Sequence, residues 1–145
     1  MISYEHKSII VQTVCSLLIP FIMVFALYVL VHGHYGPGGG FQGGVLFGVA
    51  IILQRLYLGR EAAIKRFPPV VAVVFAAIGL LIYGLAGAIP VFMGGDFLDY
   101  GSLPLFWMHG AELRSTGILI IETGVFMGVF GTMVLLFDNL IGERW

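Results

Sequence analysis

The sequence predicts an all-α integral membrane protein with four transmembrane helices, and composition and patterning both support this. Of the 145 residues, 59% are hydrophobic and only 10% are charged, whereas a soluble domain is about half apolar and about a quarter charged. The mean hydropathy is +1.03, and four separate stretches are long and apolar enough to cross a bilayer. So few charges cannot cover the apolar residues with a wettable surface, which excludes a free-standing soluble enzyme.

The four predicted helices follow one another along a single domain, residues 1–145. The first covers 8–31, an uncharged run that forms roughly 36 Å of helix, enough for a hydrocarbon core of about 30 Å. The second covers 40–58 and begins in a glycine-rich segment. The third covers 69–92, directly after Pro68, because proline is favoured at the first position of a helix. The fourth covers 115–137 and contains one charged residue, Glu122.

The distribution of basic residues orients the chain in the membrane. Four crossings place both termini on the same side as the connection between the second and third helices. Every Lys and Arg except Arg114 falls on that side: Lys7, Arg55, Arg60, Lys65, Arg66 and Arg144. An excess of positive charge marks the cytoplasmic side, so we expect both termini to be cytoplasmic. The net charge of -1 and the lack of a basic patch argue against a nucleic-acid partner.

The densest local pattern is the glycine-rich run from His32 to Gly44. It formally matches the spacing G-x-G-x-x-G, but a dinucleotide site requires a preceding β-strand, and a membrane helix precedes it here. Gly40, Gly44 and Gly48 recur every four residues and form a smooth face that another helix can approach closely. Alternatively, Pro37 to Gly40 form non-helical backbone, which a membrane tolerates only where it is buried in protein or lines a watery cavity. Both interpretations place the second helix against a partner.

Glu122 is the most informative single residue. It lies about 10 Å of helix beyond Ser115, well inside the apolar stretch. Carboxylates inside membranes are energetically expensive, and they usually mark a functional site. Burial disfavours the charged form, so Glu122 is a candidate for proton exchange. A structural carboxylate that is hydrogen-bonded to a neighbouring helix is the equal alternative.

The predicted topology gathers a set of titratable residues on the outer side: His32, His34, His109 and Glu112. His109 and Glu112 are spaced to share a helix face, which makes a metal site conceivable. There are two other interpretations: a rim of titratable residues that collects protons, or ordinary histidines at the membrane interface. No metal site is predicted. No Ser/His/Asp or Cys/His arrangement is present in the sequence. We therefore expect neither a catalytic site nor a cofactor.

A family resemblance rests on two blocks of sequence. The run Pro37-Gly-Gly-Gly-Phe-Gln-Gly-Gly44, preceded by His32-Gly-His, and the block Glu122-Thr-Gly-Val-Phe in the fourth helix resemble the MnhB/MrpB family. Its members are B subunits of Mrp-type multisubunit sodium/proton antiporters. Related subunits occur in the membrane arms of membrane-bound hydrogenase complexes. The length, the helix number and the order of the blocks also fit this family.

The resemblance implies a small, non-enzymatic accessory subunit in the plasma (inner) membrane of a prokaryote. Its partners would be lipid and the larger membrane subunits of an antiporter or hydrogenase-type complex, and protons and Na+ would be the transported ions. The resemblance assigns the ion path to Glu122 and His34. Motif and packing roles fall to Pro37, Gly38, Gly39, Gly40, Phe41, Gly43, Gly44 and Gly48.

Two other functions fit the same residues. One is a stand-alone homo-oligomeric channel or transporter in which Glu122 faces a central pore. The other is a purely structural scaffold subunit without an ion role. Neither alternative changes the predicted fold.

Overall fold

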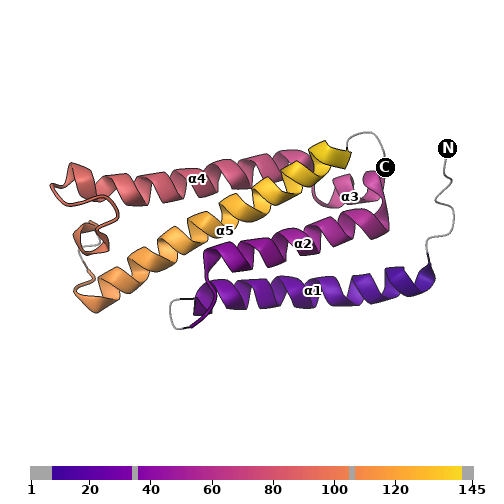
Figure 1. Ribbon diagram of the computed structural model, residues 1–145, viewed down its shortest axis with the longest axis horizontal. Helices are drawn as coiled ribbons and strands as arrows, with labels where there is room; N and C mark the ends of the chain where they lie inside the picture. The colour runs from indigo at the N-terminus through magenta and orange to yellow at the C-terminus, as the bar shows by residue number, and fades with distance from the viewer. Residues whose placement is uncertain (1–7, 34–35, 105–106, 142–145) are drawn as a thin grey trace.

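Four long helices dominate the computed structural model, which describes residues 8–33, 36–104 and 107–141 (Figure 1). Each of the four is long and apolar enough to cross a membrane, which confirms the predicted all-α membrane fold. The elements in chain order are α1 (Ile9–His32), α2 (Gly40–Leu58), α3 (Arg60–Arg66), α4 (Pro69–Phe92), the short 3-10 helix η1 (Tyr100–Ser102) and α5 (Ala111–Ile141).

The structure differs from the sequence-based expectation mainly in α5 and α3. Helix α5 has 31 residues, about 46 Å, which exceeds a hydrocarbon core of about 30 Å. The predicted range 115–137 covers only its apolar part, because the helix continues at both ends into turns that carry charges such as Glu112 and Asp138. The seven-residue α3, which follows α2 in the chain, was not predicted. It packs on α2, and its Ala63 is buried.

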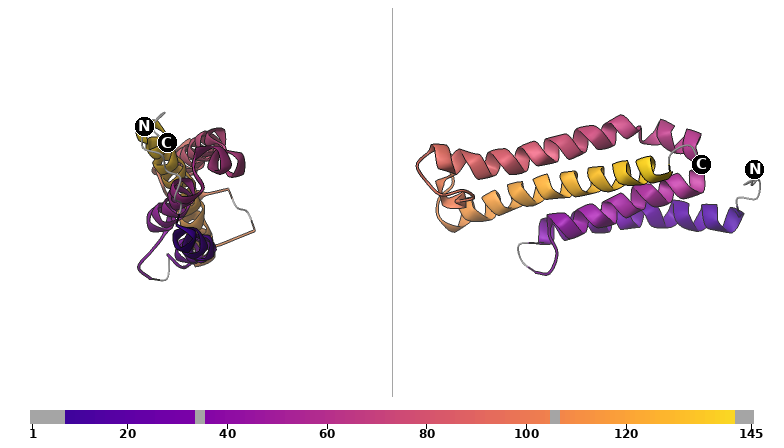
Figure 2. Two further views of the ribbon diagram at one scale, coloured as in Figure 1. Left: turned by 90° about the vertical axis from the view of Figure 1, so that its right-hand side faces the viewer. Right: turned by 45° about the horizontal axis from the view of Figure 1, so that its top comes forward.

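Helix α5 is the central element of the bundle. It packs along α4 on one side and along α2 on the other, while α1 packs mainly on α2 (Figures 1 and 2). The two hairpins α1–α2 and α4–α5 are staggered, so that the α1–α2 turn meets α5 part of the way along its length. We call the end with η1 the η1 end and the opposite end, which carries α3, the α3 end.

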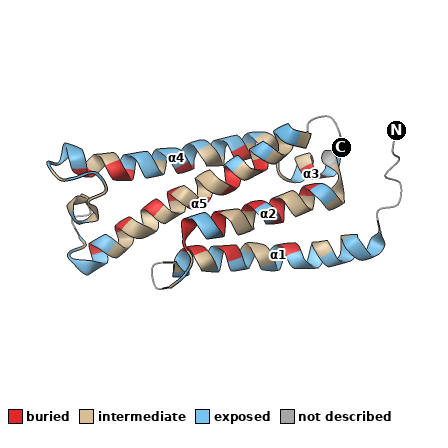
Figure 3. Ribbon diagram, in the orientation of Figure 1, coloured by how far each residue is buried: buried red, intermediate tan, exposed pale blue. Residues whose placement is uncertain are grey.

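The buried core follows the faces that these helices turn toward each other (Figure 3). Phe130 of α5 is its centre, since its ring lies 5.0 Å from that of Phe75 on α4 and 5.1 Å from that of Phe47 on α2. The remaining buried members of the cluster are Ala26, Leu30, Ile51, Ala72, Phe126 and Val134. Only 17% of the most apolar window of α1 is buried, so the rest of its apolar surface is available to lipid or to another protein.

Candidate functional site

The glycine-rich turn between α1 and α2 lies directly against Glu122 of α5. A Cβ atom on Gly39 would lie 2.9 Å from Oε1 of Glu122, and one on Gly33 would lie 3.1 Å from Oε2. A Cβ atom on Gly40 would overlap the backbone carbonyl of Glu122. Gly39 also adopts a φ of 111°, a conformation that favours glycine. Side chains at these positions would therefore push the turn away from the carboxylate.

Hydrogen bonds of the backbone hold this turn in place. The amide of Gly39 donates to the carbonyl of Val29 on α1 at 3.2 Å, and the amide of Gly43 donates to the carbonyl of Gly39 at 3.0 Å. Gly39 and Gly40 are buried. The part of the turn that contacts Glu122 is thus covered by protein, which is the condition under which a membrane tolerates non-helical backbone.

Glu122 occupies an interior position along α5. It lies about 16 Å of helix beyond Ala111, and the stagger of the hairpins brings the α1–α2 turn to the same level. The residue is half-buried, and its Oε2 atom is fully covered. The site therefore combines a carboxylate on a long apolar helix with the backbone of a glycine turn.

The other motif residues have distinct surroundings. Gly43 lies against the backbone of α1, because a Cβ atom there would be 2.8 Å from the carbonyl oxygen of Ala26. Gly40, Gly44 and Gly48 form one row that faces α5. The partner of the predicted glycine face is thus a helix of the same chain. Phe41 points away from this row and is exposed, as is Pro37 in the turn, whereas Gly38 is half-buried.

The three predicted outer residues that the structure describes, His32, His109 and Glu112, do not form one cluster. His32 ends α1, is exposed and stacks on Tyr28 with ring centroids 5.0 Å apart. His109 and Glu112 are exposed at the η1 end, beside the start of α5. His34 lies outside the described residues. Within the described part of the chain, no three His, Cys, Asp or Glu residues come close enough to hold a metal ion.

A second polar cluster lies in the connection between α4 and α5, at the η1 end. The Asp99 carboxylate accepts hydrogen bonds from the Ser102 hydroxyl at 2.6 Å and from the Gly101 amide at 3.0 Å. These two hydrogen bonds, with the nearby charge of Arg114, hold the pKa of Asp99 below its ordinary value. The cluster orders the connection that precedes α5.

Sequence reasoning missed an ion pair at the α3 end. Arg55 of α2 contacts Asp138 of α5, with Nη2 and Oδ2 2.8 Å apart, and their side chains are 2% and 18% exposed. In the sequence alone, Arg55 stands only among the basic residues that orient the chain. One signal was available: Arg55 follows Gly48 by seven residues, so both residues lie on the same side of α2.

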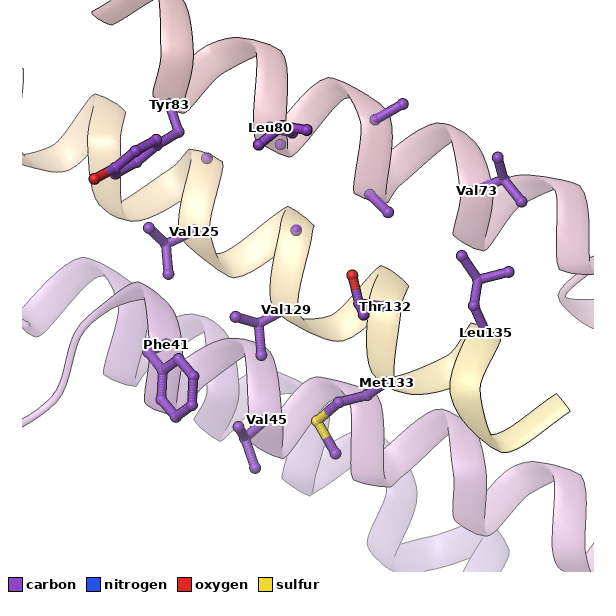
Figure 4. Close-up of a pocket in the computed structure, with 15 residues that line it drawn as sticks. Phe41, Val45, Val73, Leu80, Tyr83, Val125, Val129, Thr132, Met133 and Leu135 are labelled. Atoms are coloured by element: carbon purple, nitrogen blue, oxygen red, sulfur yellow. The ribbon is translucent and has the colours of Figure 1, made fainter. Parts of the chain in front are cut away.

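An apolar groove runs over α5 between α2 and α4 (Figure 4). It encloses about 790 Å³. Phe41 and Val45 form the α2 wall, and Val73, Leu80 and Tyr83 form the α4 wall. The floor includes small residues of α5, Gly124 and Gly128, together with the larger side chains Val129, Thr132 and Met133.

Comparison with known proteins identifies the family. Residues 10–135 match the family described as "Domain related to MnhB subunit of Na+/H+ antiporter". Relatives named "Putative antiporter subunit mnhB2" from Staphylococcus aureus strains MRSA252 and Newman are each 29% identical over 140 residues, which cover 97% of this chain and 99% of the relative. These matches confirm the resemblance carried by the glycine motif and the Glu122 block. The protein belongs to the family of domains related to the MnhB subunit of Na+/H+ antiporters.

Proposed function

We propose that this chain is a small accessory subunit of a multisubunit Na+/H+ antiporter in the plasma membrane of a prokaryote. The family match and the antiporter-subunit names of the staphylococcal relatives support this function, and the four apolar helices support the membrane location. The subunit has no catalytic site of its own in this proposal. A hydrogenase-type complex is the alternative host, because related subunits occur there.

The ion role in this proposal belongs to Glu122, and the observation that carries it is the contact between this carboxylate and the glycine turn. An intramembrane carboxylate is expensive, and it typically marks an ion or proton pathway. Gly33 and Gly39 bring backbone instead of side chains to both carboxylate oxygens. Carboxylate and backbone carbonyl oxygens are the ligands that hard cations prefer. We infer that Glu122 exchanges a proton or contacts a cation beside an ion path, with His34 as the proposed second member.

The test is Na+-dependent proton transport by everted membrane vesicles that contain the whole complex with Glu122→Gln. The glutamine keeps the shape of the side chain but cannot exchange a proton, so we expect transport to fall at least about tenfold while the complex assembles. The matched control is Glu61→Gln, an exposed carboxylate on α3, which should leave transport unchanged. Normal transport by assembled Glu122→Gln complex would remove this residue from the mechanism and favour the scaffold alternative.

We also propose that the chain packs between larger subunits and that the groove over α5 receives a transmembrane helix of one of them. The groove lies between two membrane-spanning helices. A Cβ atom on Gly128 of its floor would meet nothing within 4 Å, so this glycine leaves room for the close approach of another helix. A groove of this kind in a subunit of a larger complex needs an apolar occupant with its backbone hydrogen bonds already satisfied.

Photo-crosslinking from the groove tests this contact. A photoreactive residue at Leu80, which is exposed in the groove, should link this chain to a different, larger membrane polypeptide. The same residue at Ile10, exposed on the far helix α1, is the control for random lipid-phase contact. A product that contains only copies of this chain would instead support the homo-oligomeric channel, and lipid adducts alone would contradict the docking proposal.

A further inference from the structure

Helices α2 and α5 run in the same direction and meet along one row of contacts, which we call the α2–α5 seam. From the η1 end, Gly40 lies against the backbone of Glu122, Gly44 against that of Phe126, and Gly48 against Phe130 and Met133. Each step is about one helical turn on both helices. At the α3 end, the seam closes with the ion pair between Arg55 and Asp138.

The glycine contacts alone specify this register weakly. Glycine recurs every fourth residue on α2, so a slide of one turn along α5 would again place Gly44 and Gly48 at close-contact positions. Lipid is as apolar as the side chains, so the hydrophobic effect adds no preference for one register over another. One register can be specified by a charged group that would lose its counter-charge on such a slide.

The ion pair is such a group. Arg55 is 1% exposed, and a slide of one turn would carry its guanidinium about 5 Å from the carboxylate of Asp138. That slide would leave a buried charge without its counter-charge, which is strongly unfavourable. The pair is also poorly explained as a simple stabiliser, because Nε and Nη1 of Arg55 are buried without a hydrogen-bond partner among the described residues. Setting the register is the best-attested role for buried polar and ionic groups that add little stability.

We propose that Arg55 and Asp138 are positioning residues that fix the axial register of α2 on α5. The same register places Gly39 beside Oε1 of Glu122, about 24 Å of helix away along α5. The consequence for transport rests on the proposed role of Glu122, whereas the register itself does not.

Disulfide formation in the assembled complex reports the register directly. In a Cys15→Ser background, Gly48→Cys with Met133→Cys reports the native register, because a Cβ atom on Gly48 would lie 3.3 Å from Cβ of Met133, close to the spacing of a disulfide. Gly48→Cys with Val129→Cys reports a slide of one turn, because a Cβ atom on Gly44 would lie 3.0 Å from Cβ of Val129.

We expect Arg55→Gln or Asp138→Asn to lower the ratio of native to shifted disulfide by roughly tenfold or more. The exchange of charges, Arg55→Asp with Asp138→Arg, should recover most of the native disulfide, and Arg55→Lys should recover part of it. Lys65→Gln and Glu61→Gln, exposed charges on α3, are the matched controls. An unchanged native disulfide in Arg55→Gln, or no recovery in the charge exchange, would overturn the proposal.

Transport measured on the same samples separates this inference from the proposed function. Arg55→Gln and Asp138→Asn should lose transport in proportion to their loss of the native disulfide. The charge exchange should restore both the disulfide and transport. Glu122→Gln should lower transport at least about tenfold while leaving the native disulfide intact. If Glu122→Gln transports normally but the disulfide ratio still depends on Arg55 and Asp138, the role of Glu122 fails and the register assignment stands.

Discussion

Replacement of Gly44 by alanine is a sharp test of the α2–α5 seam. A Cβ atom at this position would lie 2.8 Å from the carbonyl oxygen of Phe126 and 3.0 Å from Cβ of Val129. Ordinary contacts of this kind are about 3.5 Å or longer, so the two helices must separate locally by roughly half an ångström or more. The closest atom belongs to the backbone, which cannot rotate away as a side chain can.

The expected cost follows from two opposing terms. Alanine favours a helix over glycine by about 1 kcal/mol, which would stabilise α2 if the added methyl group fitted. Overpacking of a tight contact costs about 1–3 kcal/mol, and separation of the seam also weakens the neighbouring contacts at Gly40 and Gly48. Relative to an alanine placed in open space, we therefore expect a loss of about 1–3 kcal/mol of stability.

Two other glycines supply matched controls. No atom lies within 4 Å of a Cβ on Gly84 of α4, so Gly84→Ala should be neutral or slightly stabilising. A Cβ on Gly48 would lie 3.3 Å from Cβ of Met133 and 3.5 Å from Cα of Phe130. These contacts are longer than those at Gly44, so Gly48→Ala should have an intermediate effect. The expected destabilisation therefore increases from Gly84→Ala through Gly48→Ala to Gly44→Ala. The larger side chain of Gly44→Leu should prevent assembly.

The assay is the fraction of complex that remains assembled after heating in mild detergent, measured by size-exclusion chromatography. Each alanine variant is compared with the unmodified complex at several temperatures, and the midpoint gives the order of stability. If Gly44→Ala is as stable as Gly84→Ala, the close approach of α2 and α5 is not what stabilises this bundle.

Two further predictions concern the core and the connection at the η1 end. Phe130 is 2% exposed and contacts aromatic rings of α2 and α4, so Phe130→Ala should cost about 3–5 kcal/mol, seen as a lower midpoint in the same heating assay; an unchanged midpoint would contradict the assigned core. The pKa of Asp99 is lowered in the folded state, so its stabilisation is complete above roughly pH 4 and is lost as the pH falls through that lowered pKa. Hydrogen exchange of the Gly101 amide should therefore show a loss of protection in acid that Asp99→Asn abolishes, and equal acid sensitivity in both proteins would refute this account.

The sequence predicted the helices well because apolar runs and helix-starting residues are local signals. Pro68 and the apolar run after it placed the start of α4 at the residue where the structure has it. The polar ends of α5 were not predicted, because a hydropathy pattern does not show that a helix continues beyond its apolar stretch. The short α3 was missed for a related reason: its sequence is mostly charged, and only tertiary contact buries Ala63.

The residues of the site could be predicted from the sequence, but the contact between them could not. Glu122 and the glycine run were each recognisable, since a carboxylate in an apolar helix and repeated glycines are unusual there. Their contact was not, because it depends on the stagger between the two hairpins, which no local pattern encodes. Arg55 shows the same limit: a basic residue near a helix end indicates topology, and only the packing of α2 on α5 reveals that Asp138 neutralises it.

The central position of α5 explains how these features depend on one another. Its contact with α4 uses Gly79, Gly124 and Gly131 for close approach, and its contact with α2 uses the row that begins at Gly40. Because α2 and α4 both pack on α5, the position of the α1–α2 turn relative to Glu122 is set by where α2 lies along α5. A shift of one turn would move the turn backbone about 5 Å relative to Glu122, which would remove Gly39 from its place beside Oε1 of the carboxylate. The chemistry proposed for Glu122 therefore requires a fixed register, and the ion pair at the opposite end of the seam is the described feature that can supply it.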